Sequence, residues 1–269
     1  MIRVAISMQG NALDASAIRR SIIEIVAHAG EGHIPSCLSI VDILCTMYDW
    51  ILDPKIDRFV LSKGHGGVGL ASVLADRGYF QKELLHEFNH FKSPFGMHLD
   101  GAKVPGVDAS TGSLGHGLSM ALGMALGARL QGKSWLTYCL LGDGECNEGS
   151  VWEAAMAAHH HKVDNLITIV DRNGFMIDGP TEDVMGLEPL ADKWRAFGWE
   201  VREIDGHNYA QIGEAIEAAQ QTKGAPLVII ANTVKGKGVD FMENKVQWHY
   251  GSVDSDLAAK AKASIAGGA

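Results

Sequence analysis

The sequence predicts an α/β fold in which a doubly wound, mostly parallel sheet carries helices on both faces. Short apolar runs alternate regularly with helical segments in the second half of the chain, as is typical of parallel strands joined by right-handed crossovers. The 269 residues are 46% hydrophobic and 20% charged, which is enough apolar material for one large core. No linker, repeat or composition shift divides them. We therefore expect a single domain over residues 1–269 with a frayed tail at 256–269.

Each element has its own local signal. Apolar residues at helical spacing predict helices, a serine and an aspartate three residues apart predict a capping box, and short apolar runs predict buried strands. The expected helices cover residues 18–29 (ended by Gly30), 39–47 (opened by Ser39 and Asp42), 81–91, 113–130, 149–161, 187–197 and 210–220, and the expected strands cover 58–62, 135–141, 166–170, 199–204 and 227–231.

Charge and cysteine usage exclude several classes of function. The formal net charge is −9 and no basic patch is visible, so neither nucleic acid nor an anionic membrane is an expected partner. The four cysteines form no CxxC pair, the first residues lack a signal-peptide core, and no run approaches the roughly 20 apolar residues of a membrane span. We expect a cytoplasmic protein with no membrane partner.

Two glycine motifs are weakened by their context. Residues 127–134 match the P-loop pattern GxxxxGK[ST], but a helix precedes them and a strand follows, the reverse of what phosphate binding needs. Residues 64–69 match GxGxxG after a strand, yet no second strand with an acidic end follows, so a nicotinamide site stays only as an alternative. We expect Gly132 to end a helix, and Gly64 and Gly66 to allow close backbone approach beside His65.

The strongest signal is a pair of polar turns after neighbouring strands. Gly142, Asp143 and Gly144 end one strand and Asn173 ends the next, so a parallel crossover places both turns at one sheet edge. A carboxylate, an amide oxygen and a nearby backbone carbonyl form a half-shell suited to Mg²⁺, with positions left for diphosphate and water. We expect both glycines to keep this loop slim and the following helix to point its N-terminus at the phosphates. The competing interpretation is a simple strand-ending turn with a capping asparagine.

These residues closely resemble the thiamine diphosphate motif of transketolases. The resemblance runs from about Ala12 to Gly251, and the chain resembles the N-terminal, pyrophosphate-binding subunit of a split transketolase. The segments that carry it are Gly142-Asp-Gly-Glu-Cys-Asn-Glu148, Val163-Asp-Asn-Leu-Ile-Thr-Ile-Val-Asp-Arg-Asn173, Thr181-Glu-Asp-Val-Met185, Leu187-Glu-Pro-Leu190, Phe197-Gly-Trp199, Ile204-Asp-Gly-His-Asn208, Gly32-His33, Leu61-Ser-Lys-Gly-His65, His98, Pro105-Gly-Val-Asp108 and Thr111-Gly-Ser-Leu-Gly115.

The resemblance implies a role for each matching residue. Magnesium, which Ca²⁺ or Mn²⁺ could replace, would be held by Asp143, Asn173 and the Phe175 carbonyl. Thiamine diphosphate would contact His65, Leu114, Gly142, Asp143, Gly144, Glu148, Asn173, Phe175 and His249, with Glu148 in an acidic network facing the partner. The catalytic groups would be His33, His65, His98 and His249, since imidazole exchanges protons near neutral pH. We expect the other histidines to be surface or capping groups: His28, His86, His90, His159, His160, His161 and His207.

The same resemblance implies an enzyme that is inactive alone. It would transfer a two-carbon ketol unit from a ketose to an aldose, together with a C-terminal pyrimidine-domain subunit of similar size, in a dimer of heterodimers. Three departures from the family pattern put the usual pentose phosphates in doubt and open the way to a branched or sulfonated sugar: Ile34 before Pro35, Leu99 after His98, and His116 in place of glutamine. Tyr250 also stands where the family has glycine after Trp-His. A non-catalytic thiamine diphosphate-binding protein, and a subunit of deoxyxylulose-phosphate synthase or of a 2-oxoacid dehydrogenase, remain as alternatives.

Overall fold

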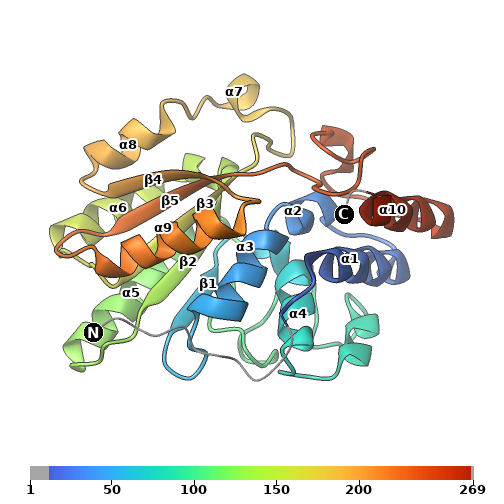
Figure 1. Ribbon diagram of the computed structural model, residues 1–269, viewed down its shortest axis with the longest axis horizontal. Helices are drawn as coiled ribbons and strands as arrows, with labels where there is room; N and C mark the ends of the chain where they lie inside the picture. The colour runs from blue at the N-terminus through green and yellow to red at the C-terminus, as the bar shows by residue number, and fades with distance from the viewer. Residues whose placement is uncertain (1–11, 268–269) are drawn as a thin grey trace.

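A five-stranded parallel sheet forms the centre of the fold in the computed structural model, which describes residues 12–267 (Figure 1). Its strands lie in the order β1-β2-β3-β5-β4 and are all parallel to their neighbours. Their bounds are β1 Arg58–Leu61, β2 Thr137–Gly142, β3 Leu166–Arg172, β4 Glu200–Asp205 and β5 Leu227–Asn232. The predicted fold class is confirmed, and every predicted strand is present with its ends shifted by at most two residues.

Side-chain alternation along the strands divides the apolar residues between two cores. In β3, Ile167 and Ile169 face one core while Leu166 and Val170 face the other. Such near-continuous burial is what a parallel sheet covered on both faces requires. The sheet therefore contributes apolar area on each side.

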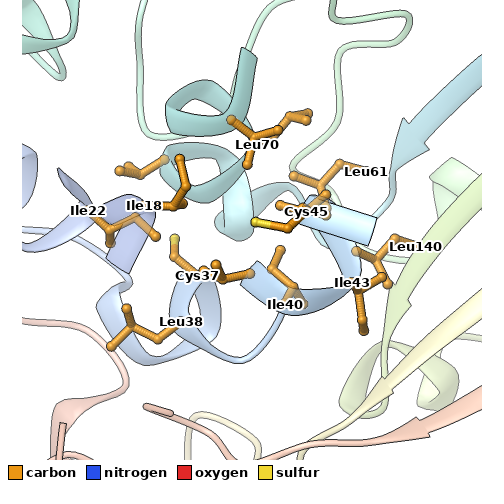
Figure 2. Close-up of a cluster of buried hydrophobic side chains, with 14 of the residues drawn as sticks. Ile18, Ile22, Cys37, Leu38, Ile40, Ile43, Cys45, Leu61, Leu70 and Leu140 are labelled. Atoms are coloured by element: carbon orange, nitrogen blue, oxygen red, sulfur yellow. The ribbon is translucent and has the colours of Figure 1, made fainter. Parts of the chain in front are cut away.

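Within residues 12–267, six helices build the core on the first side of the sheet, and the last of them, α10, packs against α1. Figure 2 shows part of this core, where apolar side chains of α1, α2, α3 and α4 meet Leu61 of β1 and Leu140 of β2. The helices are α1 Ala15–Ala29, α2 Ile34–Leu38, α3 Val41–Thr46, α4 Gly67–Asp76, α9 Tyr209–Gln221 and α10 Ser255–Gly267. As predicted, α1 ends at Gly30, which adopts a left-handed φ of 89°.

The second face is covered by α5 (His116–Leu130), α6 (Gly149–His160) and α8 (Leu190–Ala196). Trp194 is fully buried here, and its ring centroid lies 5.0 Å from that of Trp152 and 4.9 Å from that of Trp199. This aromatic group fixes α6 and α8 against each other and against the sheet.

Short helical segments connect the larger elements. They are the π-helix η1 Met47–Ile51, the 3₁₀ helices η2 Gly64–Gly66, η3 Lys82–Glu87, η4 Gly144–Asn147 and η5 Val246–Trp248, and the α-helical turn α7 Thr181–Val184. Within residues 12–267 one stretch, Ile34–Ile51, is long and apolar enough to cross a membrane by composition. It is 89% buried inside the fold, as a core segment would be, and spans α2, α3 and η1.

Several sequence-based expectations are wrong in detail. Ser39 and Asp42 form no capping box, because α3 begins at Val41 without a side-chain cap and the Ser39 hydroxyl donates to Asp171 Oδ2 at 2.8 Å. Residues 255–267 are not frayed: they form α10, which buries Ala258, Ala261 and Ile265. The predicted helix over 81–91 is reduced to the short η3.

The two discounted glycine motifs behave as expected. Residues 127–130 finish α5, and Gly132 follows at a left-handed φ of 64° before the strand β2, so no P-loop forms there. Residues 81–91 contain no strand, so the GxGxxG segment lacks the second strand of a dinucleotide site.

Candidate active site

One cavity of about 360 Å³ lies at the carboxyl ends of β1, β2 and β3 and gathers every residue predicted for the site. This is the sheet edge at which α/β folds bind ligands. The predicted residues that line it are His33, His65, His98, Leu114, Gly142, Asp143, Gly144, Glu148, Asn173, Phe175 and His249. Their functional roles stay predictions, but the topology brings them together from seven separate segments of the chain.

The two polar turns meet as the spacing predicts. Gly142 pairs with Asp171 in the register of β2 and β3, which places Asp143 beside the β3 turn that carries Asn173. Asp143 is 1% exposed; its Oδ1 accepts from the Gly144 N–H at 2.8 Å and its Oδ2 from the Gly174 N–H at 2.6 Å. Burial, followed by the nearby charge of Asp171, raises the pKa of Asp143 above its ordinary value.

Arg172 compensates the buried charge of Asp143. Its guanidinium donates to Asp143 Oδ2 at 3.1 Å, and also to Glu182 Oε1 at 3.1 Å and Glu188 Oε1 at 2.9 Å. The arginine thus connects the β2 turn to the segment around α7. Sequence reasoning did not single it out, because its three acidic partners are spread over the chain.

The oxygen atoms expected to hold a metal all face the same cavity, with a cation already among them. Asn173 Oδ1 accepts from the Phe175 N–H at 3.1 Å, and the Phe175 carbonyl accepts from the Lys235 ammonium at 3.1 Å. Within residues 12–267 no group of three or more His, Cys, Asp or Glu side chains could hold a metal. A divalent cation here would depend on the single carboxylate of Asp143 with amide and carbonyl oxygens, a donor set that suits Mg²⁺.

Two buried lysines lie behind these ligands, and only one of them has a carboxylate partner. Lys63 pairs with Asp171 at 2.5 Å, and both side chains are fully buried. Burial would raise the pKa of Asp171, but the Lys63 charge and several hydrogen bonds outweigh it and hold that pKa below its ordinary value. A buried pair of this kind fixes the ends of β1 and β3 relative to each other.

Lys235 is the unpaired one. It is 1% exposed and contacts the Phe175 carbonyl and, at 2.8 Å, Nδ1 of His249; it has no carboxylate within 4 Å in the described part of the chain. Burial and then the charge of Lys63 lower its pKa to about 8, so it remains mostly protonated at neutral pH. A buried ammonium that contacts only neutral groups lacks a counter-ion, and an anion in the cavity would compensate its charge.

A buried hydroxyl is a second polar group of the cavity that lacks a matching partner in the described part of the chain. Ser36 Oγ lines the cavity and has no hydrogen-bond partner among residues 12–267. Sequence reasoning missed Ser36, Lys63 and Lys235 as site residues. Lys63 lay inside a quoted motif, and Lys235 follows the end of β5 at the same sheet edge, which is the signal that could have identified it.

The other end of the cavity is lined by imidazoles. The His33 ring centroid lies 5.5 Å from that of His65, 6.4 Å from that of His98 and 5.6 Å from that of His249. Burial, reinforced by nearby positive groups, lowers the pKa of His33 to about 4 and of His249 to about 3, and that of His65 well below 6.5. These three rings are therefore neutral at pH 7, and each offers one N–H donor and one acceptor nitrogen.

Glycines permit the close packing at this end. A Cβ on Gly64 would lie 2.8 Å from the backbone nitrogen of Gly112, and a Cβ on Gly112, whose φ is +150°, would lie 2.9 Å from the His98 ring. The expected close approach beside His65 is therefore present. In the turn after β2 only Gly144 is tightly packed, since a Cβ there would lie 3.0 Å from Met176, whereas a Cβ on Gly142 would find ordinary room at 3.7 Å. The expectation that both glycines keep that loop slim is thus half right.

The helix that follows this loop also differs from expectation. The first turn after Gly142 is the 3₁₀ segment η4, and its Gly144 N–H is already taken by Asp143. Glu145, within η4, is buried and accepts from Ser62 Oγ at 2.5 Å and from the Gly115 and Gly142 N–H groups. Glu145 therefore organises the loop backbone, and Asp143 acts both as a cap and as a candidate ligand.

The histidines outside the cavity mostly fit their expected places. His159 and His160 lie in the last turn of α6 and His161 follows it. His28 packs beside His86 and His90, with ring centroids 5.4 and 5.6 Å apart.

His207 and His116 need separate mention. His207 is not a simple surface or capping group, since its Nδ1 contacts the buried Asp42 at 2.6 Å and its Nε2 accepts from the Val234 N–H. Asp42 is also held by Arg19, so this network joins α1, α3 and the loop after β5. His116 opens α5, is exposed, and is not among the cavity residues.

Comparison with known proteins gives one consistent result. The family model described as transketolase, thiamine diphosphate binding domain, matches residues 11–266. A 6-deoxy-6-sulfo-D-fructose transketolase subunit of Clostridium sp. (strain MSTE9) is 42% identical over 93% of this chain and 94% of its own length. A subunit of apulose-4-phosphate transketolase from Phocaeicola vulgatus is 40% identical over 89% of this chain and 88% of its own.

Solved structures agree with the fold. The crystal structure of a transketolase from Campylobacter jejuni superimposes with a TM-score of 0.87 at 31% identity, covering 94% of this chain. The chain spans only 42% of the length of that structure, so the solved transketolase contains a further portion that these residues do not match.

Proposed function

Because the chain belongs to the transketolase family, as its thiamine diphosphate-binding domain, we propose that it is the N-terminal subunit of a heteromeric transketolase. It matches proteins named as transketolase subunits over nearly their whole length, whereas it covers less than half of a one-chain transketolase. The enzyme transfers a two-carbon ketol unit from a ketose to an aldose. The remaining portion of the active site comes from a C-terminal subunit of similar size.

The observation that carries this proposal is the unpaired Lys235 ammonium beside Asp143, Asn173 and Phe175 in one cavity. The three oxygen ligands hold Mg²⁺, and Ca²⁺ or Mn²⁺ can take its place. Lys235 and the free hydroxyl of Ser36 bind the diphosphate oxygens, so an anion replaces the neutral contacts now made by the lysine. Thiamine diphosphate, when bound, supplies the carbanion chemistry that a protein side chain cannot.

The imidazole end binds the sugar. Neutral His33, His65 and His249 donate one hydrogen bond and accept another, which matches the donor and acceptor character of sugar hydroxyls. The same rings take up and release protons at the hydroxyl groups as the carbon–carbon bond is broken and made. His98 joins them at the sugar, 6.4 Å from His33 between ring centroids.

We further propose that the donor is a specialised ketose. Relatives of this chain are named for 6-deoxy-6-sulfo-D-fructose and for apulose 4-phosphate. Two of the departures from the usual family motif, Ile34 and Leu99, directly follow histidines of the cavity and are buried. They change the wall that supports His33 and His98, which favours a sugar of unusual shape such as a branched or sulfonated one.

The surface beside the cavity fits a partner subunit. Ile177 lines the cavity and is 60% exposed, and Met185 and Val184 nearby in the chain are 60% and 40% exposed. Apolar groups at the opening of a site gain stability when a second chain covers them. We propose that the C-terminal subunit docks here, that two such pairs assemble as a dimer of heterodimers, and that the complex works in the cytoplasm, where the four free, buried cysteines stay reduced.

Native mass spectrometry tests the proposal. The chain is captured from its own cells with Mg²⁺ and thiamine diphosphate present, and the recovered complex is assayed for ketol transfer. We expect a second subunit of similar size, bound cofactor and transfer activity in the complex but not in the isolated chain. A cofactor-free chain with no partner, or a complex that transfers no ketol unit, would overturn the proposal.

A further inference from the structure

His33 is a catalytic candidate whose ring is surrounded mainly by other rings. Its Nδ1 is buried and has no hydrogen-bond partner within residues 12–267. What surrounds the ring is other rings, and the nearest of these belongs to Tyr250, with centroids 4.7 Å apart and planes inclined by 58°. The neighbouring imidazoles of His65 and His249 lie farther away, at 5.5 and 5.6 Å.

Tyr250 is itself held in place on the same two segments. Gly32 and Gly251 form an antiparallel bridge, with the Gly32 N–H donating at 2.9 Å and the Gly251 N–H at 3.2 Å. Burial, followed by the nearby carboxylate of Glu31, raises the pKa of the Tyr250 phenol. Residues 31–33 and 249–251 therefore form a clasp, defined here as these two segments, with His33 on its inner side.

The clasp coincides with two positions where this chain departs from the family motif. The usual Gly-His-Pro reads Gly-His-Ile here, and the usual glycine after Trp-His is Tyr250. A proline would restrict the backbone of the histidine before it, and that restriction is absent at His33. The ring of Tyr250 supplies a different restraint, acting on the side chain in place of the backbone.

We propose that Tyr250 is a positioning residue that holds the His33 ring toward the sugar end of the cavity. The inference rests on the proposed function, because it concerns a histidine assigned to the sugar. It does not require Tyr250 to touch the substrate. A ring displaced by about 1 Å from its productive place is enough to lower turnover substantially.

The first test measures the His33 ring in the full-length chain without cofactor, by NMR titration of the imidazole nitrogens. The groups facing His33 are His65, His98, His249, Lys63 and Lys235, and none of them is altered. Because burial is the main cause of its low pKa, Tyr250→Ala should let His33 protonate at pH 5, where the wild-type ring stays neutral. Tyr250→Phe, which keeps the ring, should behave as wild type.

Phe91→Ala is the matched control, since Phe91 is an aromatic residue that is 92% exposed and contacts no histidine ring in the described structure. It should leave the His33 titration unchanged. An unaltered titration in Tyr250→Ala would overturn the inference whatever the activity of the complex.

The second test follows ketol transfer from hydroxypyruvate to an aldehyde acceptor, in the complex that contains both subunits. We expect Tyr250→Ala to lower kcat at least tenfold with KM changed less than threefold, and Tyr250→Phe to stay within about threefold of wild type. The positioning role would be overturned if Tyr250→Ala raised KM without lowering kcat, or if Tyr250→Phe lowered kcat as much as Tyr250→Ala does. A wild-type complex that transfers no ketol unit would overturn the proposed function, and the titration result would then stand alone.

Discussion

At the end of the cavity where we propose that diphosphate binds (the diphosphate end), the side chains are attached to strand ends and held by charged hydrogen bonds. At the imidazole end they come from loops and are held largely by ring packing. Asp143 and Asn173 follow paired strands and have defined partners. His33 and Tyr250 lie on segments joined by one bridge between two glycines. The first end is built to hold a fixed charge distribution, and the second to adapt its shape. Cofactor affinity should therefore depend on the first, and turnover and sugar choice on the second.

The largest effect should come from the buried ion pair beneath the diphosphate end. Lys63→Met leaves Asp171 charged and without its cation in a fully buried site, which should lower the free energy of unfolding by about 3–5 kcal/mol. The matched control is Lys103→Met, which removes an exposed pair with Asp100 and should change the free energy of unfolding little. Urea denaturation of both variants measures the difference. Equal losses of unfolding free energy would show that the buried pair contributes no more to stability than the exposed pair.

Asp143→Ala tests the metal site at the same end. Asp143 is the only carboxylate among the proposed ligands, so we expect Mg²⁺-dependent binding of thiamine diphosphate to weaken by about a hundredfold or more, which corresponds to roughly 2.7 kcal/mol. Calorimetry on the complex measures this, and circular dichroism checks that the fold is kept. Asp192→Ala, at an exposed position on α8, is the control. Undiminished binding in Asp143→Ala would refute the site.

Lys235→Met should have a smaller effect on the same binding. The lysine contributes one buried cation to the diphosphate, and its loss leaves the metal ligands in place, so we expect affinity to fall by about tenfold, or roughly 1.4 kcal/mol. Lys223→Met, on the exposed segment after α9, should change nothing. If both variants bind the cofactor as wild type does, the anion-binding role of Lys235 is wrong.

The smallest predicted effect concerns the imidazole end and pH. Since the pKa of His33 is about 4 when folded and 6.5 ordinarily, the unfolded chain binds its proton first, and stability falls as the pH drops from 6.5 toward 4. After a discount for the partial exposure of the ring, this pKa shift of His33 contributes about 1 kcal/mol to the free energy of unfolding. His33→Asn should therefore lose less stability than wild type between pH 7 and pH 5 in urea denaturation, and His160→Asn should match wild type. If the stability of His33→Asn fell with pH as steeply as that of the wild type, His33 would not be the source of this pH dependence.

The two ends also differ in how far the sequence could predict them. Asp143 and Asn173 follow apolar runs, and the rule that parallel strand ends share one edge was enough to bring them together. His98 and His249 lie in irregular segments, so only the family motif indicated them. Ser36 was missed because a hydroxyl on a five-residue helix carries no local pattern, and Lys235 was missed although it follows the end of β5 at the same sheet edge.

The wrong local predictions have tertiary causes. Ser39 has the spacing of a capping residue, but its hydroxyl bonds to Asp171, more than a hundred positions away, where it stabilises a buried carboxylate. The C-terminal segment has the composition of a solvated tail, yet Ala258, Ala261 and Ile265 recur at helical spacing and pack against α1. In both cases a long-range contact outweighs the local preference.

The contact of Lys235 with His249 also limits where one proton can lie. His249 Nδ1 is 2.8 Å from the Lys235 ammonium, which can only donate, and 3.2 Å from the Met176 carbonyl, which can only accept. A neutral ring satisfies one of these neighbours at a time. While the ammonium stays, the imidazole proton is on Nε2; once an anion draws the ammonium away, Nδ1 can turn donor and Nε2 is freed to accept. The tautomer of His249 therefore depends on where the Lys235 ammonium lies.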